Sequence, residues 1–467
     1  MSFLLVIRKN RLTSVGAKDW NLKTDPCPID VEKLSTLLCP YKTQNISTKS
    51  FHQFHLYMSS TGSFHGDHAL FPANSPQIDI SPWLRIKIQN HILKIDSDQM
   101  GMYPLWLYET SDVYYFTSEL KALGSIKGFT YKFKDDSDIL GIKKREKSFC
   151  FLKDVLNLSI HYVEIDLQSM QKVCTLKPAL IFQEKWSLNP EIAKKQLRSS
   201  LLESAAEIEK TANDSTWGSF LSGGIDSSVA TVLLQEKRKN LKSYTLGTKL
   251  GNEYAEAREV ASELGIESHE LFVSQDEALD LFNEVIWQNE VFDGLTSEIL
   301  AQMKALIQFC STKSSNIITG YGSDLLFGGM LRHKEYMEAV GITNEQELIE
   351  RTYWSGEFRP FYSLSSGVEL YHLYWFPLLI QTSMRIPSDL HFQAGVEKVL
   401  LRELAVESRW LKREHSFRPK IGMTNGTHFF RLLSNALNIH NTYDYPTKTA
   451  YAWEFLKNKL NAATKEK

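Results

Sequence analysis

Apolar and polar residues follow two different periodicities along the chain, and the change falls near residue 185. Up to about residue 180, short runs of alternating apolar and polar residues predict β-strands. These runs are Ser2–Val6, Phe54–Met58, Ile86–Ile95, Val113–Thr117 and Val163–Ile165. From Ile192 to Thr211 the apolar residues recur at helical spacing instead. We therefore expect a β-rich N-terminal domain, residues 1–184, followed by a second domain, residues 185–467.

The second domain alternates strand patterns with helix patterns. Strands are predicted at 217–221, 243–247, 267–273 and 316–319, and helices at 227–237, 253–264, 277–288 and 295–309. Such alternation is typical of an α/β fold with a doubly wound parallel sheet, in which ligands bind at the carboxyl ends of the strands. From about residue 333 onward the pattern is mainly helical. The tail, Asn461–Lys467, has the composition of a disordered segment.

Composition narrows the class of protein. The 467 residues are 43% hydrophobic and 23% charged, as in a soluble globular protein. A net charge of −2 gives no support for a nucleic-acid or membrane partner. No apolar run approaches the length of a membrane span, and the start of the chain is too short in apolar residues for a signal sequence. Five scattered cysteines predict reduced thiols in a cytoplasmic protein, with neither a zinc site nor a disulfide framework.

The segment Phe220–Ser228, with the sequence FLSGGIDSS, joins a predicted strand to a predicted helix. Ser222, Gly223 and Gly224 form a turn of small residues whose backbone N–H groups can close on an anion at the helix N-terminus. Asp226 and Ser227 fall in the first helical turn, where a carboxylate can hold Mg²⁺ against phosphate oxygens. Glycine, aspartate and serine also occur in ordinary turns and N-caps, so this segment alone does not decide the function.

A second glycine-rich segment, Thr319–Gly329, follows the predicted strand 316–319. It should therefore open at the same edge of the sheet as the first segment, because the carboxyl ends of parallel strands meet there. Asp324 is then a second carboxylate for Mg²⁺, which favours a few carboxylates together with phosphate oxygens. A glycine-rich loop with a solvated aspartate is the alternative.

Together these two segments resemble the asparagine synthetase superfamily of ATP-pyrophosphatase enzymes, which adenylate a carboxylate and pass the acyl group to an amine. Asp98–Leu105 and Phe116–Leu123 resemble segments of the family's N-terminal glutaminase-like domain. The resemblance implies an α+β N-terminal domain built as an Ntn-type β-sandwich, then an ATP-pyrophosphatase synthetase domain with extra C-terminal helices. It also implies ATP and Mg²⁺ as cofactors, with further nucleotide contacts from Leu221, Leu246 and Gly320.

The N-terminal domain departs from the family pattern. Working glutaminase domains of the superfamily expose a cysteine at the N-terminus after removal of methionine, whereas this chain has Ser2 there and its first cysteine is Cys27. Serine is a far weaker nucleophile than a thiolate unless a base activates it. We expect a degenerate glutaminase domain with a structural role, while residual hydrolysis by a processed N-terminal serine stays open.

Three residues resemble those of the β-lactam-forming synthetases of the superfamily, and the segments Asn289–Glu298 and Gly320–Gly329 are most similar to carbapenam synthetases. The resemblance implies that Tyr321, coupled to Glu357, accepts the proton of an attacking amine. It implies that Lys420 stabilises the tetrahedral oxyanion and the leaving pyrophosphate. The alternatives are a packing tyrosine, a solvated turn and a surface lysine.

Further substrate and nucleotide contacts are implied by the same resemblance. Lys398 matches a family lysine that touches pyrophosphate, although a Lys/Arg pair four residues apart is ordinary on a helix. Glu290 and Gly322 are expected to contact the substrate. Asp293 and Glu298 could also bind its amine, with N-capping and solvation as the alternatives.

The sequence thus favours a cytoplasmic ATP-dependent carbon–nitrogen ligase of antibiotic biosynthesis. It would adenylate the side-chain carboxylate of an amino diacid, 5-carboxymethylproline, and close a β-lactam to give a carbapenam, AMP and pyrophosphate. We expect a small-molecule substrate and a homo-oligomer, a dimer or a tetramer. Three alternatives stay open: another β-lactam or a macrolactam, asparagine synthesis from free ammonia, and a non-catalytic nucleotide-binding protein.

Overall fold

The structure is a computed structural model, and the residues it describes leave several gaps. Ser2, Cys27, Lys420 and the predicted domain boundary between residues 184 and 185 lie outside the described residues. The described ranges are 3–8, 29–30, 33–34, 37, 47–51, 54–58, 63–65, 68–71, 82–140, 146–177, 189–210, 216–238, 240–327, 343–419 and 421–464.

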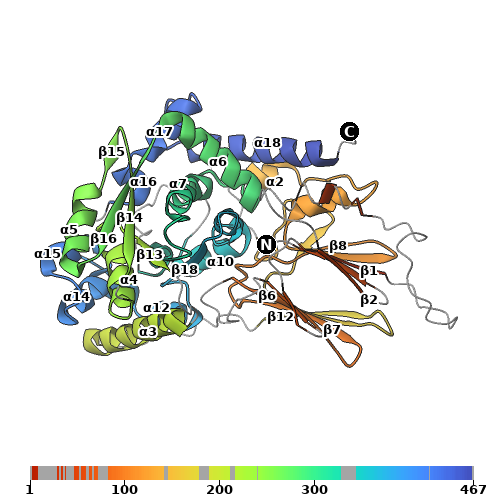
Figure 1. Ribbon diagram of the computed structural model, residues 1–467, viewed down its shortest axis with the longest axis horizontal. Coiled ribbons are helices and arrows are strands. Elements are labelled where there is room, and N and C mark those ends of the chain that lie inside the picture. Colours follow the sequence, from red (N-terminus) through yellow and green to blue (C-terminus); the bar gives the residue numbers. More distant parts are fainter. Residues whose placement is uncertain are drawn as a thin grey trace.

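Two antiparallel sheets make up the N-terminal part, and they lie one above the other at the right of Figure 1. Among the described residues, the first has the order β10 (Val155–Asn157), β8 (Trp106–Glu109), β9 (Val113–Thr117), β1 (Phe3–Arg8), β3 (Phe54–Met58) and β2 (Ser47–Phe51). The second has the order β12 (Lys172–Leu176), β11 (His161–Asp166), β7 (Ile92–Ser97), β6 (Leu84–Gln89), β5 (His68–Phe71) and β4 (Ser63–His65). Short helices follow at η1 (Leu120–Ser125) and α2 (Asp136–Leu140).

Strand β1 shows why the two sheets form a sandwich. Phe3, Leu5 and Ile7 point into one hydrophobic core that they share with β6, β7 and β11 of the other sheet. Leu4 and Val6 face the opposite way and join a second core. Side chains alternate between the two faces of a strand, so a continuous apolar run buries both faces.

The predicted strand Ile86–Ile95 is wrong as a single element. The structure divides it into β6 and β7, which pair in an antiparallel hairpin. Asn90 and His91 form the two-residue turn, with φ values of 50° and 64°. Turns of this length match the twist of the flanking strands when both central residues have positive φ, and asparagine tolerates that conformation well.

The second part contains a parallel sheet of the predicted doubly wound type. Its described strands are β16 (Glu267–Val273), β14 (Lys242–Thr248), β13 (Trp217–Phe220), β17 (Asn316–Thr319) and β18 (Glu369–His372), in that spatial order. A short strand, β15 (Gly251–Asn252), pairs antiparallel with the end of β14. Chain order reverses between β13 and β17, and such a switch point leaves a crevice at the carboxyl ends of the strands.

Strand β18 was missed, because the sequence beyond residue 333 was interpreted as mainly helical. Its sequence, ELYH, lacks the pair of isoleucines that marks the equally short β17, NIIT. Its pairing with β17 gives the sheet a fifth parallel strand among the described residues.

Helices cover both faces of the parallel sheet. On one face lie α3 (Pro190–Lys210), α4 (Ile225–Gln235), α5 (Tyr254–Leu264), α12 (Pro377–Arg385) and α14 (Val399–Glu407). On the other lie α6 (Gln275–Asn289), α7 (Gly294–Cys310), α17 (Phe429–Ala436) and α18 (Tyr445–Thr464). Further elements complete the part: α8 (Ser323–Leu326), α10 (Glu345–Ser355), α11 (Phe361–Leu364), α13 (Ser388–His391), β19 (Phe392–Gln393), β20 (Val396–Glu397), α15 (Arg413–Ser416) and α16 (Met423–Gly426).

The C-terminal helix α18 joins the two parts of the molecule. It packs on α6, α7 and η1, and in Figure 1 it extends from the parallel sheet to a position above the sandwich. One core holds its Leu456 and Leu460 together with Leu4 and Val6 of β1. The prediction of a disordered tail from Asn461 is wrong as far as Thr464, because these buried leucines anchor the last turns of the helix.

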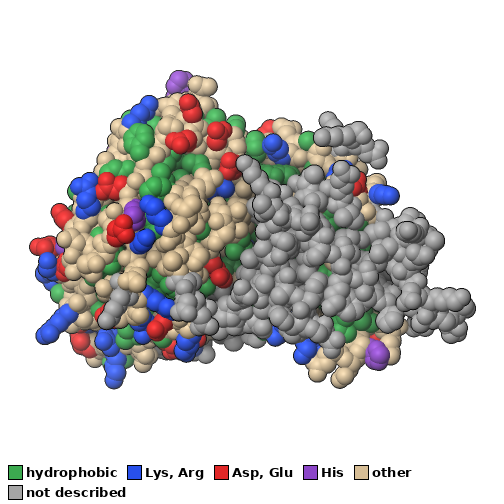
Figure 2. Space-filling view, viewed as in Figure 1, with side chains coloured by type: hydrophobic (Ala, Val, Ile, Leu, Met, Phe, Trp, Pro, Cys, Tyr) green, Lys and Arg blue, Asp and Glu red, His purple; other side chains and the backbone are tan. Residues whose placement is uncertain are grey.

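The described surface is of mixed charge. Lys and Arg side chains alternate with Asp and Glu over the face shown in Figure 2. Among the described residues, no helix has both the length and the apolar composition that crossing a bilayer requires. Cys150, Cys174 and Cys310 are free thiols.

Candidate active site

The turn between β13 and α4 has the closed shape that the sequence predicts. Gly223 has a φ of 78°, and a Cβ atom there would lie 2.6 Å from the backbone of Glu256. The Ser227 hydroxyl lies 3.2 Å from both the backbone nitrogen and the hydroxyl of Ser222. Gly224 is the N-cap residue of α4. Backbone N–H groups at the start of a helix, framed by small residues, form a suitable site for phosphate.

A second loop, which leaves β17, touches this turn. A Cβ atom on Gly320 would lie 2.6 Å from the backbone nitrogen of Ser227, so the two loops can meet only at a glycine. Gly322 has a φ of 94° and is the N-cap residue of α8. Tyr321, between the two glycines, is thereby held at the switch point of the sheet.

Asp226 and Asp324, the two predicted magnesium ligands, lie on these two loops and face the same cation. The Lys398 ammonium forms ion pairs with Asp226 Oδ2 and, at 2.5 Å, with Asp324 Oδ1, and it lies 3.1 Å from Ser323 Oγ. Two carboxylates within reach of one cation are a donor set that suits Mg²⁺ when phosphate oxygens complete it. Within the described ranges, no cluster of three or more His, Cys, Asp or Glu side chains could hold a metal ion.

Tyr321 and Glu357 are brought together as predicted from the resemblance. The tyrosine hydroxyl donates to Glu357 Oε2 at 3.0 Å, and Glu357 is only 4% exposed. Burial and the nearby Glu357 carboxylate raise the pKa of Tyr321 well above its usual value. Burial likewise raises the pKa of Glu357, and the Arg351 guanidinium opposes this rise. These shifts favour the neutral phenol and increase the proton affinity of the Glu357 carboxylate, which suits the pair to accept a proton.

Arg351, on α10, connects the Tyr321–Glu357 pair to helix α7. Its guanidinium donates to Glu357 Oε2 at 3.3 Å, to Asp293 Oδ1 at 2.7 Å and to Thr296 Oγ1 at 2.8 Å. Asp293 accepts from Thr296 N at 2.8 Å as the N-cap of α7, which was the alternative considered for it. A buried chain of charges thus runs from α7 through α10 to Tyr321.

Aromatic neighbours fix the ring of Tyr321. Phe358 and His372 lie with ring centroids 5.1 and 5.8 Å from it, and Phe358 stacks on Trp375 at 4.2 Å. His372 Nδ1 lies 2.7 Å from Thr319 Oγ1, and burial lowers its pKa to about 3. A neutral imidazole therefore supports the tyrosine without adding charge to the site.

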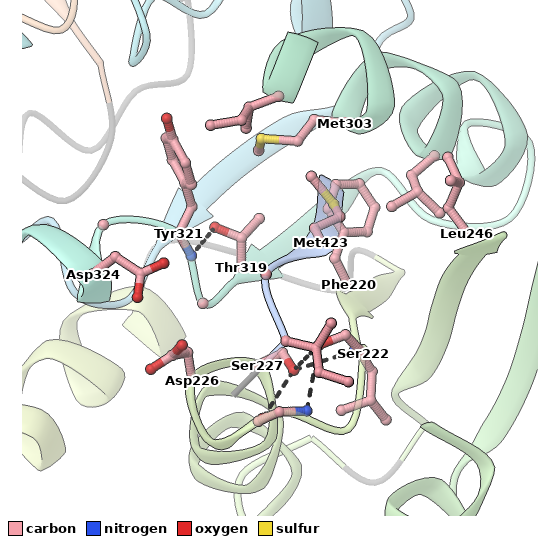
Figure 3. A pocket seen from close by; sticks show the side chains of 18 of the residues that line it. Phe220, Ser222, Asp226, Ser227, Leu246, Met303, Thr319, Tyr321, Asp324 and Met423 are labelled. Atoms are coloured by element: carbon pink, nitrogen blue, oxygen red, sulfur yellow. Dashed lines mark hydrogen bonds between the residues drawn. The ribbon is translucent and has the colours of Figure 1, made fainter. Parts of the chain in front are cut away.

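A single cavity of about 210 Å³ is lined both by the turn from Ser222 to Ser227, here called the phosphate loop, and by the Tyr321–Glu357 pair, here called the dyad. In Figure 3, Asp226 and Asp324 lie close together on one side, while Phe220, Leu246, Met303 and Met423 form an apolar region on another. Gly223 and Lys398 do not line this cavity, but Lys398 pairs with both of its aspartates. The predicted residues that line it are Leu221, Ser222, Gly224, Asp226, Ser227, Leu246, Gly320, Tyr321, Gly322, Asp324 and Glu357.

Glu290, predicted to contact substrate, lies elsewhere. Its carboxylate accepts hydrogen bonds from the backbone nitrogens of Leu120 and Lys121, at 2.8 and 2.7 Å, at the start of η1. It is 2% exposed and does not line the cavity. Glu290 thus stabilises the contact between the sandwich and the parallel-sheet part, because a carboxylate compensates free N–H groups at a helix start.

Glu298 is also neither a substrate ligand nor a solvated side chain. It is fully buried and forms an ion pair with Lys448 Nζ at 2.5 Å. Burial raises the pKa of Glu298, and the lysine opposes that rise. Lys448 follows Glu298 by 150 residues in sequence, a separation at which no spacing pattern reveals a pairing.

The segment around Lys420 passes along the cavity. Arg418, Ile421 and Gly422 line it, and Arg418 donates to the carbonyl of Gly223 at 3.3 Å. Lys420 itself is outside the described residues, so its catalytic role stays a prediction.

Comparisons with known proteins address the family. Residues 196–361 match the model of the asparagine synthase family. The glutamine-hydrolyzing asparagine synthetase of Rattus norvegicus is 28% identical over 361 residues, which cover 70% of this chain and 60% of that protein. The carboxyethyl-arginine beta-lactam-synthase of Streptomyces clavuligerus is 29% identical over 209 residues, which cover 44% of this chain and 40% of that protein.

Among solved structures, NMN synthetase from Francisella tularensis aligns with a TM-score of 0.27 and 15% identity, over 60% of this chain and 98% of its own. A score this low carries no argument. The chain spans about 60% of the length of the rat asparagine synthetase. Residues 196–361 thus match the asparagine synthase family, and the chain is similar in sequence to the asparagine synthetases.

Proposed function

We propose that this protein is an ATP- and Mg²⁺-dependent synthetase that closes a β-lactam. It adenylates the side-chain carboxylate of an amino diacid, 5-carboxymethylproline, and forms a carbapenam, AMP and pyrophosphate. The observation that carries the proposal is the hydrogen bond of 3.0 Å between Tyr321 and Glu357, in a cavity shared with the phosphate loop. The asparagine synthase domain and the similarity to a beta-lactam-synthase support it.

Adenylation would take place on the phosphate loop. A carboxylate oxygen of the substrate attacks the α-phosphorus of ATP, the bond to the bridging oxygen breaks, and pyrophosphate leaves. Ser222 to Ser227 would hold the phosphates, and Asp226 with Asp324 would hold Mg²⁺. The metal ion, when bound, neutralises phosphate charge and stabilises the leaving group. Lys398, which pairs with both carboxylates, would hold them in place and would also contact pyrophosphate.

Ring closure would take place at the dyad. The amine loses a proton, its nitrogen attacks the acyl carbon, the new C–N bond forms, and the C–O bond to AMP breaks. Glu357 Oε2 accepts a hydrogen bond from the Tyr321 hydroxyl. The phenol can therefore take the amine proton while it passes its own proton to Glu357. Amine and acyl group belong to one molecule, which removes the entropic cost of bringing them together.

Two further parts of the proposal concern Lys420 and the N-terminal sandwich. Lys420 would stabilise the tetrahedral oxyanion, and one donor at such a centre lowers the barrier by about 3–4 kcal/mol. The N-terminal sandwich would act as a structural support, since its β1 shares a core with α18 of the second part. We also propose a homo-oligomer in the cytoplasm.

Mass spectrometry tests the proposal directly. The protein is incubated with ATP, Mg²⁺ and 5-carboxymethylproline, and the expected product has lost one water while AMP and pyrophosphate accumulate. A parallel incubation with aspartate and ammonium is the control for asparagine synthesis. Asparagine in that control, with no change in the diacid, would refute lactam formation.

A further inference from the structure

Helix α7 presents an apolar wall to the cavity beside the dyad. The wall consists of Leu295, Ile299 and Met303, which are four residues apart and therefore lie on one face of the helix. Leu295 and Ile299 are only half-buried, so each keeps apolar surface open to the cavity. Open apolar surface inside a site favours a ligand that covers it with hydrocarbon.

The position of this wall assigns it to the acyl substrate. Thr296, between Leu295 and Ile299, accepts the hydrogen bond of 2.8 Å from Arg351, and Arg351 contacts Glu357 of the dyad. Leu295 and Ile299 therefore lie at the end of the cavity where the amine reacts. The phosphate loop enters the cavity from β13 and α4, elements separate from this wall.

The charges around the wall exclude a second charged group on that side of the substrate. In the described part of the chain, the basic residues lining the cavity are Arg351 and Arg418. Arg351 is paired with Asp293 and Glu357, and Arg418 with Glu259. A substrate carboxylate facing α7 would lose its hydration against apolar side chains without gaining a free cation.

The amine, in contrast, has a clear acceptor. Glu357 lines the cavity, and its Oε2 accepts the hydrogen bond of Tyr321. A carboxylate attracts an ammonium group, so the amine is expected at this side of the cavity.

We propose that the substrate is a β-amino acid whose amine binds Glu357 and whose hydrocarbon body packs on Leu295, Ile299 and Met303, with no charged group on that side. This substrate class rests on the proposed function, because it takes Glu357 as the site of the reacting amine. For 5-carboxymethylproline it means that the pyrrolidine edge faces α7 and the unreacted carboxylate points away from it.

Matched probes test the substrate class. Pyrrolidine-2-acetic acid is 5-carboxymethylproline without the unreacted carboxylate, piperidine-2-acetic acid adds one methylene, and 3-aminoglutaric acid replaces the ring by a second charge. Binding is measured by calorimetry with a non-hydrolysable ATP analogue and Mg²⁺, and turnover by ATP–pyrophosphate exchange and product mass. We expect both ring compounds to bind at least about tenfold more tightly than 3-aminoglutaric acid.

Variants of the wall separate this inference from the proposed function. Ile299→Asn should weaken binding of the ring compounds about tenfold and leave the affinity for the ATP analogue unchanged, while Gln308→Ser, at an exposed position of the same helix, should change neither. Equal use of 3-aminoglutaric acid, or no effect of Ile299→Asn, would overturn the inference and spare lactam formation. Tight binding of the ring compounds without any turnover would overturn lactam formation and leave the substrate class standing.

Discussion

Replacement of Arg351 by methionine removes a guanidinium that lies between two carboxylates, those of Asp293 and Glu357. The side chains of Arg351 and Glu357 are each 5% exposed, and that of Asp293 is 13% exposed. Removal of one partner from a buried ion pair leaves an uncompensated charge and typically costs about 3–5 kcal/mol. Asp293 keeps its bond to Thr296 N, so most of the cost should fall on Glu357.

The cost should depend on pH, with a sign fixed by Glu357. Burial raises the pKa of this carboxyl in the folded protein, and loss of Arg351 removes the group that opposes the rise. A group with a raised folded-state pKa binds its proton more tightly in the folded state, so stability is lost as pH rises from its unfolded-state pKa through its folded-state pKa. Arg351→Met should therefore be more destabilised at pH 8 than at pH 5.5, because a lower pH favours the neutral form of Glu357, which needs no cation.

Urea unfolding of three variants, each compared with the wild type, measures this effect. The double variant Arg351→Met/Glu357→Gln removes the orphaned charge and should recover at least half of the stability lost at pH 8. Arg258→Met is the matched control: Arg258 pairs with Glu270 at 2.5 Å but is 60% exposed, so its loss should cost less than about 1 kcal/mol at either pH. An equal loss for Arg351→Met at both pH values, with no recovery from Glu357→Gln, would refute the electrostatic account.

Four further changes test other contacts. Tyr321→Phe removes the donor to Glu357 and should reduce lactam formation by at least about 100-fold, with ATP–pyrophosphate exchange largely retained; equal loss of both would mean a structural role. Gly320→Ala places a methyl group 2.6 Å from a backbone nitrogen of α4, and should raise the KM for ATP and cost about 1–3 kcal/mol in thermal unfolding. Asp324→Asn should raise the Mg²⁺ concentration for half-maximal exchange by about tenfold or more, and an unchanged Mg²⁺ titration would exclude it as a ligand. Lys448→Met should destabilise the fold by about 3–5 kcal/mol in urea unfolding, and addition of Glu298→Gln should reverse much of that loss.

The parts of the site that sequence reasoning found share one property: each depends on a local pattern. Ser222 to Ser227 follow strand β13 and begin helix α4. Asp324 likewise follows strand β17 and lies in the first turn of α8, so the topology of the parallel sheet brings the two segments together. Arg351 lacked any such signal. It is one arginine on an amphipathic helix, and its importance comes from Asp293, 58 residues earlier in the chain.

The two errors at acidic residues have the same physical origin. Glu290 and Glu298 lie next to the start of α7, and the sequence cannot distinguish a carboxylate that faces a ligand from one that faces the rest of the protein. The structure distinguishes them by partners distant in sequence: Leu120 and Lys121 of η1 for Glu290, and Lys448 of α18 for Glu298. A buried carboxylate is thus explained in each case by a packing contact between elements.

Contacts that are local in sequence form the nucleotide-binding part of the site, and contacts that are distant in sequence form the part where the amine reacts. The phosphate loop is built within one strand–turn–helix unit, and it can bind a nucleotide whatever acyl group is present. The part of the site where the amine reacts requires α7, α10 and the loop after β17 to be correctly placed relative to one another. Arg351 of α10 contacts Asp293 and Thr296 at α7 and also Glu357, which binds Tyr321 of that loop. Under the proposed function, changes in α7 or α10 would therefore alter the substrate and leave adenylation intact. The choice of substrate would then depend on the packing of these two helices, and Leu295 and Ile299 are the positions at which we expect a change of substrate first.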